Sequence, residues 1–284
     1  MIIGGDKKPV IENIKAALRD EDYSRKVELG DPKLSAKERT AVCFGFIKKR
    51  RTLGYKIRNR AARTIENIVG WAINRDTEVV GMENIKSVKG GAIVTSNHFN
   101  PLDSTIIRKL ATKTRRRRLF IVSQDTNFAV PGFLGFLLYN ADTIPITQDP
   151  HYQKNAFIPL LKRLFKRKRW VLIYPEQEMW FNYRKPRPPK RGAYYFAAKC
   201  GVPVISCFTE MIELDERDNE QFKKVRYVLH VLPPIYPEKG LTVRENSIKM
   251  MERDYEQKKR AYEFAYGKAL TYEFSKSDIA GFIG

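Results

Sequence analysis

Apolar residues change their spacing twice along the chain. Between residues 35 and 74 they recur every three or four positions, which is the spacing of a helix, and the capping box Ser35-Ala36-Lys37-Glu38 stands at its start. The residues before 35 are polar, and their pattern indicates no particular helix or strand. From residue 77 to 237 short apolar runs are separated by Gly, Pro and Asn, a pattern typical of strands alternating with helices. A second capping box, Thr242-Val243-Arg244-Glu245, then begins a charged helix.

The middle of the chain predicts a sheet with covering helices. We expect strands at residues 92–95, 119–123, 170–174, 202–207 and 225–232, and helices at 104–112, 155–165 and 192–200. The fold class that follows is α/β, with a mixed central sheet flanked by helices, a basic amphipathic helical segment before it and a helix after it. The predicted boundaries are 1–75 for the N-terminal helical segment, 76–240 for the core and 241–284 for the helical tail.

The second half of the N-terminal helical segment combines an apolar stripe with a basic face. The stripe consists of Ile57, Ala61, Ile65, Ile68, Val69 and Ala72, and the cations between them are Lys56, Arg58, Arg60 and Arg63. Such a stripe either packs on the protein's own core or lies in a membrane interface, and the pattern leaves both open. Trp71, near the end of the helix, favours a membrane-association segment.

Charge narrows the choice of partner. Lys and Arg number 53 against 32 Asp and Glu, so we expect a polyanionic partner: a phospholipid surface, a nucleic acid or a phosphorylated substrate. The three cysteines, Cys43, Cys200 and Cys207, lack close metal-ligand spacing, so neither a disulfide framework nor a metal site is expected. No run approaches the ~18 apolar residues of a spanning helix, and the N-terminus lacks a secretory-signal pattern. We therefore expect a cytoplasmic protein, peripheral on the inner face of the cell membrane.

The candidate chemistry centres on one histidine. Of the three histidines, His98 follows a predicted strand directly and lies in the polar turn Ser96-Asn97-His98-Phe99-Asn100-Pro101-Leu102-Asp103. A carboxylate five residues further on can fold back to hold the far imidazole nitrogen and fix its tautomer. Alternatively, Asp103 caps the following helix and His98 is hydrogen-bonded passively, and the spacing alone does not decide between the two.

Four sequence blocks give this histidine a context. The first block is Asn97-His98 with Asp103, and the segment Val80-Gly81-Met82-Glu83-Asn84-Ile85 precedes it. The other three blocks follow in this order: Tyr174-Pro175-Glu176, Lys190-Arg191-Gly192-Ala193 and Gly201-Val202-Pro203-Val204-Ile205. Blocks in this order over roughly 130 residues are far more specific than any one of them. Together they resemble the lysophospholipid acyltransferase family, which contains 1-acylglycerol-3-phosphate acyltransferase.

The resemblance implies an O-acyltransferase that moves a fatty acyl group from an activated thioester to the hydroxyl of a lysophospholipid-type acceptor. His98 would be the general base, oriented by Asp103. Asn97 and Glu176 would support and position the substrate. Nearby cations, Arg184, Lys190 and Arg191, could hold an acceptor phosphate. No cofactor is expected beyond the acyl donor, acyl-CoA or acyl-ACP, and acyl carrier protein would in the second case be a partner.

The family pattern is incomplete in this chain. After Glu176 the family usually continues Gly-Thr-Arg-Ser, whereas here the sequence is Gln177-Glu178-Met179-Trp180, and the stretch 142–148 has no arginine where the family has one. Those family residues are associated with holding the acceptor phosphate, so another lipid or a cell-envelope acceptor is an alternative. A basic nucleic-acid-binding protein is a further alternative, although the chain has no RNP-like strand, helix-turn-helix spacing or zinc ligands.

Overall fold

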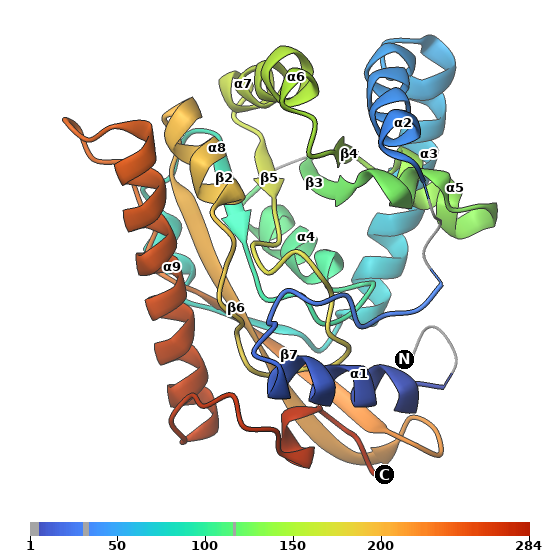
Figure 1. Ribbon diagram of the computed structural model, residues 1–284, viewed down its shortest axis with the longest axis vertical. Helices are drawn as coiled ribbons and strands as arrows, with labels where there is room; N and C mark the ends of the chain where they lie inside the picture. Colours follow the sequence, from blue (N-terminus) through green and yellow to red (C-terminus); the bar gives the residue numbers. More distant parts are fainter. Residues whose placement is uncertain (1–5, 31–33, 116–117) are drawn as a thin grey trace.

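The computed structural model describes residues 6–30, 34–115 and 118–284. Within these ranges the strands are β1 Glu78–Val80, β2 Ala92–Thr95, β3 Leu119–Gln124, β4 Thr143–Ile146, β5 Trp170–Leu172, β6 Val204–Arg217 and β7 Lys223–Val231. They form one sheet in the order β1-β7-β6-β2-β5-β3-β4 (Figure 1). The strands from β6 to β4 in this order are parallel to their neighbours, whereas β7 is antiparallel to β6 and parallel to β1. The predicted α/β class with a mixed central sheet is therefore confirmed.

Helices cover both faces of the sheet. The α-helices of the described ranges are α1 Lys8–Arg19, α2 Ala36–Lys49, α3 Leu53–Ile73, α4 Ser104–Lys113, α5 Gly132–Asn140, α6 Pro150–Tyr152, α7 Ile158–Lys166, α8 Gly192–Cys200 and α9 Val243–Tyr266. Short helical turns add η1 Met82–Ile85, η2 Asp125–Ala129, η3 Gln153–Phe157 and η4 Lys276–Asp278. Alternate residues of β2 point to opposite faces. Ile93 packs with α7 and α8, and Ala92 and Val94 pack with α4.

The N-terminal helices differ from the prediction in two ways. The single helix expected from residue 35 to 74 is two helices, because Thr52 begins a new one by accepting the Tyr55 N–H with its hydroxyl at 3.2 Å. α1 was not expected at all. Its buried residues Val10, Ile11, Ile14, Ala17 and Leu18 lie on one helical face among many polar neighbours, and they pack against Trp180 and Phe181. The N-terminus thus covers a loop that is distant in sequence.

α3 turns its apolar stripe away from the rest of the protein and packs through a mixed face that buries Tyr55, Asn59, Ala62 and Gly70. Asn59 is buried and its amide donates to the Asp142 carboxylate at 2.8 Å, and Glu66 forms an ion pair with Arg108 of α4. Burial raises the pKa of Glu66 to about 7, although Arg108 opposes this shift. The stripe points outward, and its residue Ile57 is 63% exposed. The alternative in which this stripe packs on the protein's own described core is therefore wrong.

No helix in the described ranges combines the length and the apolar character that are needed to cross a membrane.

Candidate active site

The loop that carries His98 leaves the sheet at the carboxyl end of β2. Asn97 replaces a strand partner there: its amide nitrogen donates to the Thr209 carbonyl at 3.0 Å, and its amide oxygen accepts the Thr209 N–H at 2.8 Å. The side chain thus satisfies the backbone hydrogen-bonding groups of Thr209 on β6, while the main chain turns away from the sheet. Since β3, β4, β5 and β6 run parallel to β2, their carboxyl ends lie at the same edge, which is where open α/β sheets bind ligands.

His98 and Asp103 are in direct contact. The imidazole Nδ1 lies 2.8 Å from Asp103 Oδ2, and the same oxygen accepts the backbone N–H groups of Phe99 at 3.0 Å and Asn100 at 3.3 Å. Asp103 occupies the N-cap position of α4 but makes no capping bond to it. Its carboxylate therefore folds back on the histidine, and the alternative of a simple helix cap is not what the structure contains.

Tyr174, at the end of β5, completes this cluster. Its hydroxyl donates to Asp103 Oδ1 at 2.5 Å, and its ring stacks on the imidazole of His98 with centroids 3.9 Å apart and planes 11° from parallel. Burial, with the neighbouring carboxylate, raises the pKa of Tyr174 well above its ordinary value, so the hydroxyl remains a donor. The sequence analysis missed this role, and the only signal was that Tyr174 opens the Tyr-Pro-Glu block.

The arrangement leaves one imidazole nitrogen available. With Nδ1–H donated to Asp103, the lone pair is on Nε2 of a side chain that is 21% exposed, whereas Asp103 is 4% exposed. A neutral imidazole oriented by a buried carboxylate can accept a proton from a hydroxyl.

Glu176 holds the backbone of this loop. Its Oε2 accepts the His98 N–H at 3.3 Å and Arg187 Nη2–H at 2.9 Å, and its Oε1 accepts the Arg187 backbone N–H at 3.1 Å. Burial lowers the pKa of Arg187, and the adjacent Glu176 opposes the change. The guanidinium also lies 4.4 Å from the ring centroid of Trp180, and the backbone N–H of Trp180 donates to the His98 carbonyl at 3.1 Å. The Glu176 carboxylate thus holds the backbone of His98, and its predicted role in positioning substrate stays a prediction.

The other cations of the segment after Glu176 have different environments. Arg184 is paired with Glu213 of β6 at 2.5 Å, and Lys185 is paired with Asp278 at 2.7 Å. Lys190 and Arg191 have exposed side chains at the start of α8, and the Lys190 N–H donates to the Pro175 carbonyl at 2.8 Å. Their predicted contact with substrate, like that of Arg184, stays a prediction.

Gln177 occupies the position of the family's glycine and keeps a glycine-like backbone, with φ at +67°. Left-handed backbone costs an L-residue about 1–2 kcal/mol, and glycine loses about 0.5–1 kcal/mol more than alanine in entropy on folding. We therefore expect Gln177→Gly to raise the free energy of unfolding by roughly 0.5–1 kcal/mol. Urea unfolding checks this, with Gln177→Ala as the control that keeps the strain. A less stable glycine variant would contradict the expectation.

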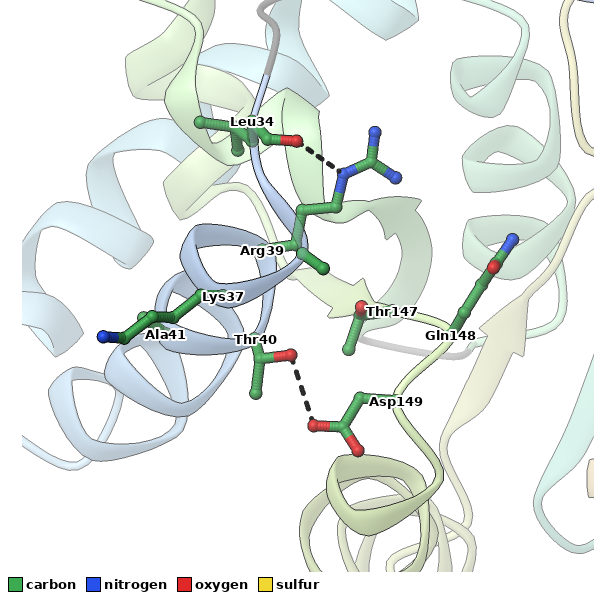
Figure 2. Close-up of a pocket in the computed structure, with 9 residues that line it drawn as sticks. Leu34, Lys37, Arg39, Thr40, Ala41, Thr147, Gln148 and Asp149 are labelled. Carbon is green, nitrogen blue, oxygen red and sulfur yellow. Dashed lines mark hydrogen bonds between the residues drawn. The ribbon is translucent and has the colours of Figure 1, made fainter.

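A cavity of about 760 Å³ opens beyond β4, between the start of α2 and the segment after Ile146 (Figure 2). Figure 2 shows Thr40 and Asp149 facing each other across it, and the Thr40 hydroxyl donates to Asp149 Oδ2 at 3.2 Å. Gln148, from the stretch without the family's arginine, lines the cavity, and so do Lys37 and Arg39. Arg39 Nε lies 3.8 Å from Asp125, at the end of β3, so the cavity belongs to the same edge of the sheet as His98.

Part of the chain matches a known protein family. Residues 76–210 match the model of a protein family described as Acyltransferase. The chain is therefore similar to that acyltransferase family over a segment that includes His98, Asp103 and Glu176.

One curated protein and one solved structure that are similar to this chain are named as acyltransferases for acylated glycerol phosphates. The chain is similar to a chloroplastic 1-acyl-sn-glycerol-3-phosphate acyltransferase of Brassica napus, at 29% identity over 133 residues. The match takes in 45% of this chain and 36% of the relative, so it spans about a third of that protein's length. The fold is similar to that of the 1-acyl-sn-glycerophosphate acyltransferase PlsC from Thermotoga maritima, with a TM-score of 0.51 and 20% identity over 83% of this chain and 98% of that one.

Proposed function

We propose that this protein is an O-acyltransferase that transfers a fatty acyl group from an activated thioester to the hydroxyl of a lysophospholipid-type acceptor. The observation that carries the proposal is the 2.8 Å contact between His98 and Asp103 at the carboxyl edge of the parallel strands. The names of the two relatives, both acyltransferases for acylated glycerol phosphates, support the class of acceptor.

The proposed mechanism uses His98 as a general base. Its Nε2 accepts the proton of the acceptor hydroxyl while that oxygen attacks the thioester carbonyl and forms the new C–O bond. Asp103 stabilises the imidazolium through Nδ1–H. When the C–S bond breaks, the imidazolium returns the proton to the leaving thiolate, so no acyl-enzyme is needed. The acyl donor, acyl-CoA or acyl-ACP, is a co-substrate and no further cofactor takes part.

An acceptor headgroup with a phosphate requires cations near this edge. Lys190 and Arg191 are exposed beside Pro175, and the cavity beyond β4 is lined by Lys37, which is exposed, and Arg39, which is partly exposed. Guanidinium groups suit phosphate oxygens because they donate two parallel hydrogen bonds. These groups supply positive charge in a chain that has no arginine in the stretch 142–148, where the family has one.

The direct test is an acyl-transfer assay with the purified protein. Long-chain acyl-CoA and acyl-ACP are offered with 1-acylglycerol-3-phosphate, neutral lysophospholipids and a soluble sugar alcohol, and ester formation is measured by mass spectrometry. We expect ester only with the lysophospholipid acceptors. Transfer to the sugar alcohol alone would contradict the proposed acceptor class, and background transfer throughout would contradict the enzyme.

We also propose that α3 attaches the protein to anionic lipid on the cytoplasmic face of a membrane. The residues Leu53, Ile57, Ile68 and Trp71 are 62–74% exposed, and Phe133 on the adjoining α5 is 64% exposed. The cations Lys56, Arg58 and Arg60 are exposed on the same helix. An apolar face flanked by cations complements an anionic bilayer, and each cation near the surface contributes about 1 kcal/mol.

Trp71→Glu is expected to weaken binding to vesicles that contain anionic phospholipid by about tenfold or more, because it removes an interfacial ring and adds a negative charge. Vesicle co-sedimentation at low and high salt measures this. Phe264→Glu is the matched control, since Phe264 is an 86% exposed ring on α9. If both variants bind like the wild type, or if the wild type dimerises through this face instead, the attachment by α3 is wrong.

A further inference from the structure

We propose that Tyr174 is a positioning residue for catalysis: its hydroxyl holds the Asp103 carboxylate and its ring holds the imidazole plane of His98. The assignment of a catalytic effect rests on the proposed acyl transfer, whereas the effect on the histidine's protonation does not. Two separate contacts of one side chain carry the proposal, the 2.5 Å hydrogen bond to Asp103 Oδ1 and the parallel stack at 3.9 Å.

The hydroxyl fixes the rotation of the carboxylate. Asp103 Oδ2 has three donors, the imidazole and the N–H groups of Phe99 and Asn100, and Tyr174 is the donor to Oδ1. A carboxylate with donors on both oxygens cannot turn without losing hydrogen bonds. Oδ2 therefore stays opposite Nδ1, and Nε2 keeps the lone pair.

The ring fixes the imidazole from the other direction. The two rings are stacked with an interplanar angle of 11°, so tilting the imidazole would push one edge of it against the tyrosine ring. Tyr174 is close to the site in space because β5 is the neighbour of β2 in the sheet, with Val94 beside Leu172. The stack thus depends on strand order, although 71 residues separate Tyr174 from Asp103 in sequence.

The hydroxyl also affects the charge of the site. Its hydrogen carries partial positive charge next to Asp103, so it reduces the stabilisation that the carboxylate gives to an imidazolium. The other charged or titratable groups near the cluster are the Glu176–Arg187 pair, which contacts the His98 backbone, the Glu66–Arg108 pair, and Tyr227 beside Asp103. The substitution Tyr174→Phe leaves both ion pairs and Tyr227 unchanged and removes only the hydroxyl.

The experiment compares Tyr174→Phe with the wild type by two measurements. In NMR titration of imidazole-labelled protein without substrate, with the His98 signal assigned by its loss in His98→Ala, we expect the titration midpoint to rise by about 0.5–1 pH unit. In steady-state assays we expect kcat to fall about tenfold with little change in KM, and the acid limb of the pH profile to move upward with the NMR midpoint.

Tyr227→Phe is the matched control. Like Tyr174, Tyr227 is partly buried near Asp103, and it packs on Phe99 with ring centroids 5.4 Å apart, but among the described residues its hydroxyl makes no hydrogen bond to Asp103. It should leave the midpoint and kcat unchanged. An unchanged or lowered midpoint in Tyr174→Phe, or an equal shift in Tyr227→Phe, overturns the proposal.

The two proposals fail in different ways. If the wild type transfers no acyl group but the midpoint still rises in Tyr174→Phe, the hold of Tyr174 on the pair stands and the acyltransferase function falls. If the wild type is active and kcat is the same in Tyr174→Phe, the positioning role is overturned and the acyltransferase function stands.

Discussion

His98→Ala is expected to lower kcat for acyl transfer by about 10²- to 10⁴-fold, the usual contribution of a general base. The substitution removes the nitrogen that accepts the hydroxyl proton, and no second histidine is in position to replace it: His230 is bound to Glu210 at 2.7 Å, and His151 is exposed on α6 beside Asn155. KM should change little, because a proton acceptor acts on the transition state more than on the bound ground state.

The matched control is His151→Ala. It removes an exposed imidazole from the same chain, and we expect wild-type kcat from it. Both variants should unfold at the wild-type urea concentration, since His98 is only partly buried and its loop is held mainly through backbone contacts to Glu176 and Trp180. Retention of more than a third of the activity in His98→Ala would contradict the general-base role.

Arg187→Met is expected to destabilise the fold by about 3–5 kcal/mol, because it leaves the buried carboxylate of Glu176 without its partner. Arg187 is 2% exposed and Glu176 is 4% exposed, and the guanidinium also donates to the Tyr23 carbonyl at 3.0 Å. The substitution therefore also removes the contact between the N-terminal segment at Tyr23 and the loop that contains Arg187. Urea unfolding followed by tryptophan fluorescence measures it, since Trp180 lies under the guanidinium.

Two further variants make this result specific. Arg191→Met changes an exposed arginine in the same segment and should leave the unfolding midpoint within error of the wild type. Arg187→Met combined with Glu176→Leu should recover part of the loss, because apolar side chains of similar volume tolerate burial better than one unpaired charge. Equal stability of Arg187→Met and the wild type would mean that this ion pair does not support the loop.

Local patterns were sufficient for most of the elements and for the contact between His98 and Asp103. The short apolar run Ala92-Ile93-Val94-Thr95 predicted β2, and the capping boxes at Ser35 and Thr242 marked the starts of α2 and α9. His98 and Asp103 are five residues apart, so one turn of chain is enough to bring them together. The order of the four blocks connected this pair to a family because each block lies in sequence next to a recognisable strand or helix.

Short or mixed patterns were not sufficient. α1 has its buried residues among lysines and acids, so its composition looked polar. The break at Thr52 interrupts a continuous helical spacing, and only the cap shows that a second helix begins there. β1 and β4, of three and four residues, are too short for alternation to distinguish them from a loop.

The sequence by itself determined the α/β class, the His98–Asp103 pair and the basic amphipathic character of α3, because each depends on residues close together in the chain. Only the tertiary structure decided which face of α3 is exposed, that Arg187 is paired with Glu176, and that Tyr174 contacts both His98 and Asp103. These contacts depend on the order of strands in the sheet and on burial. Both bring together residues that are tens of positions apart, and no local spacing encodes them.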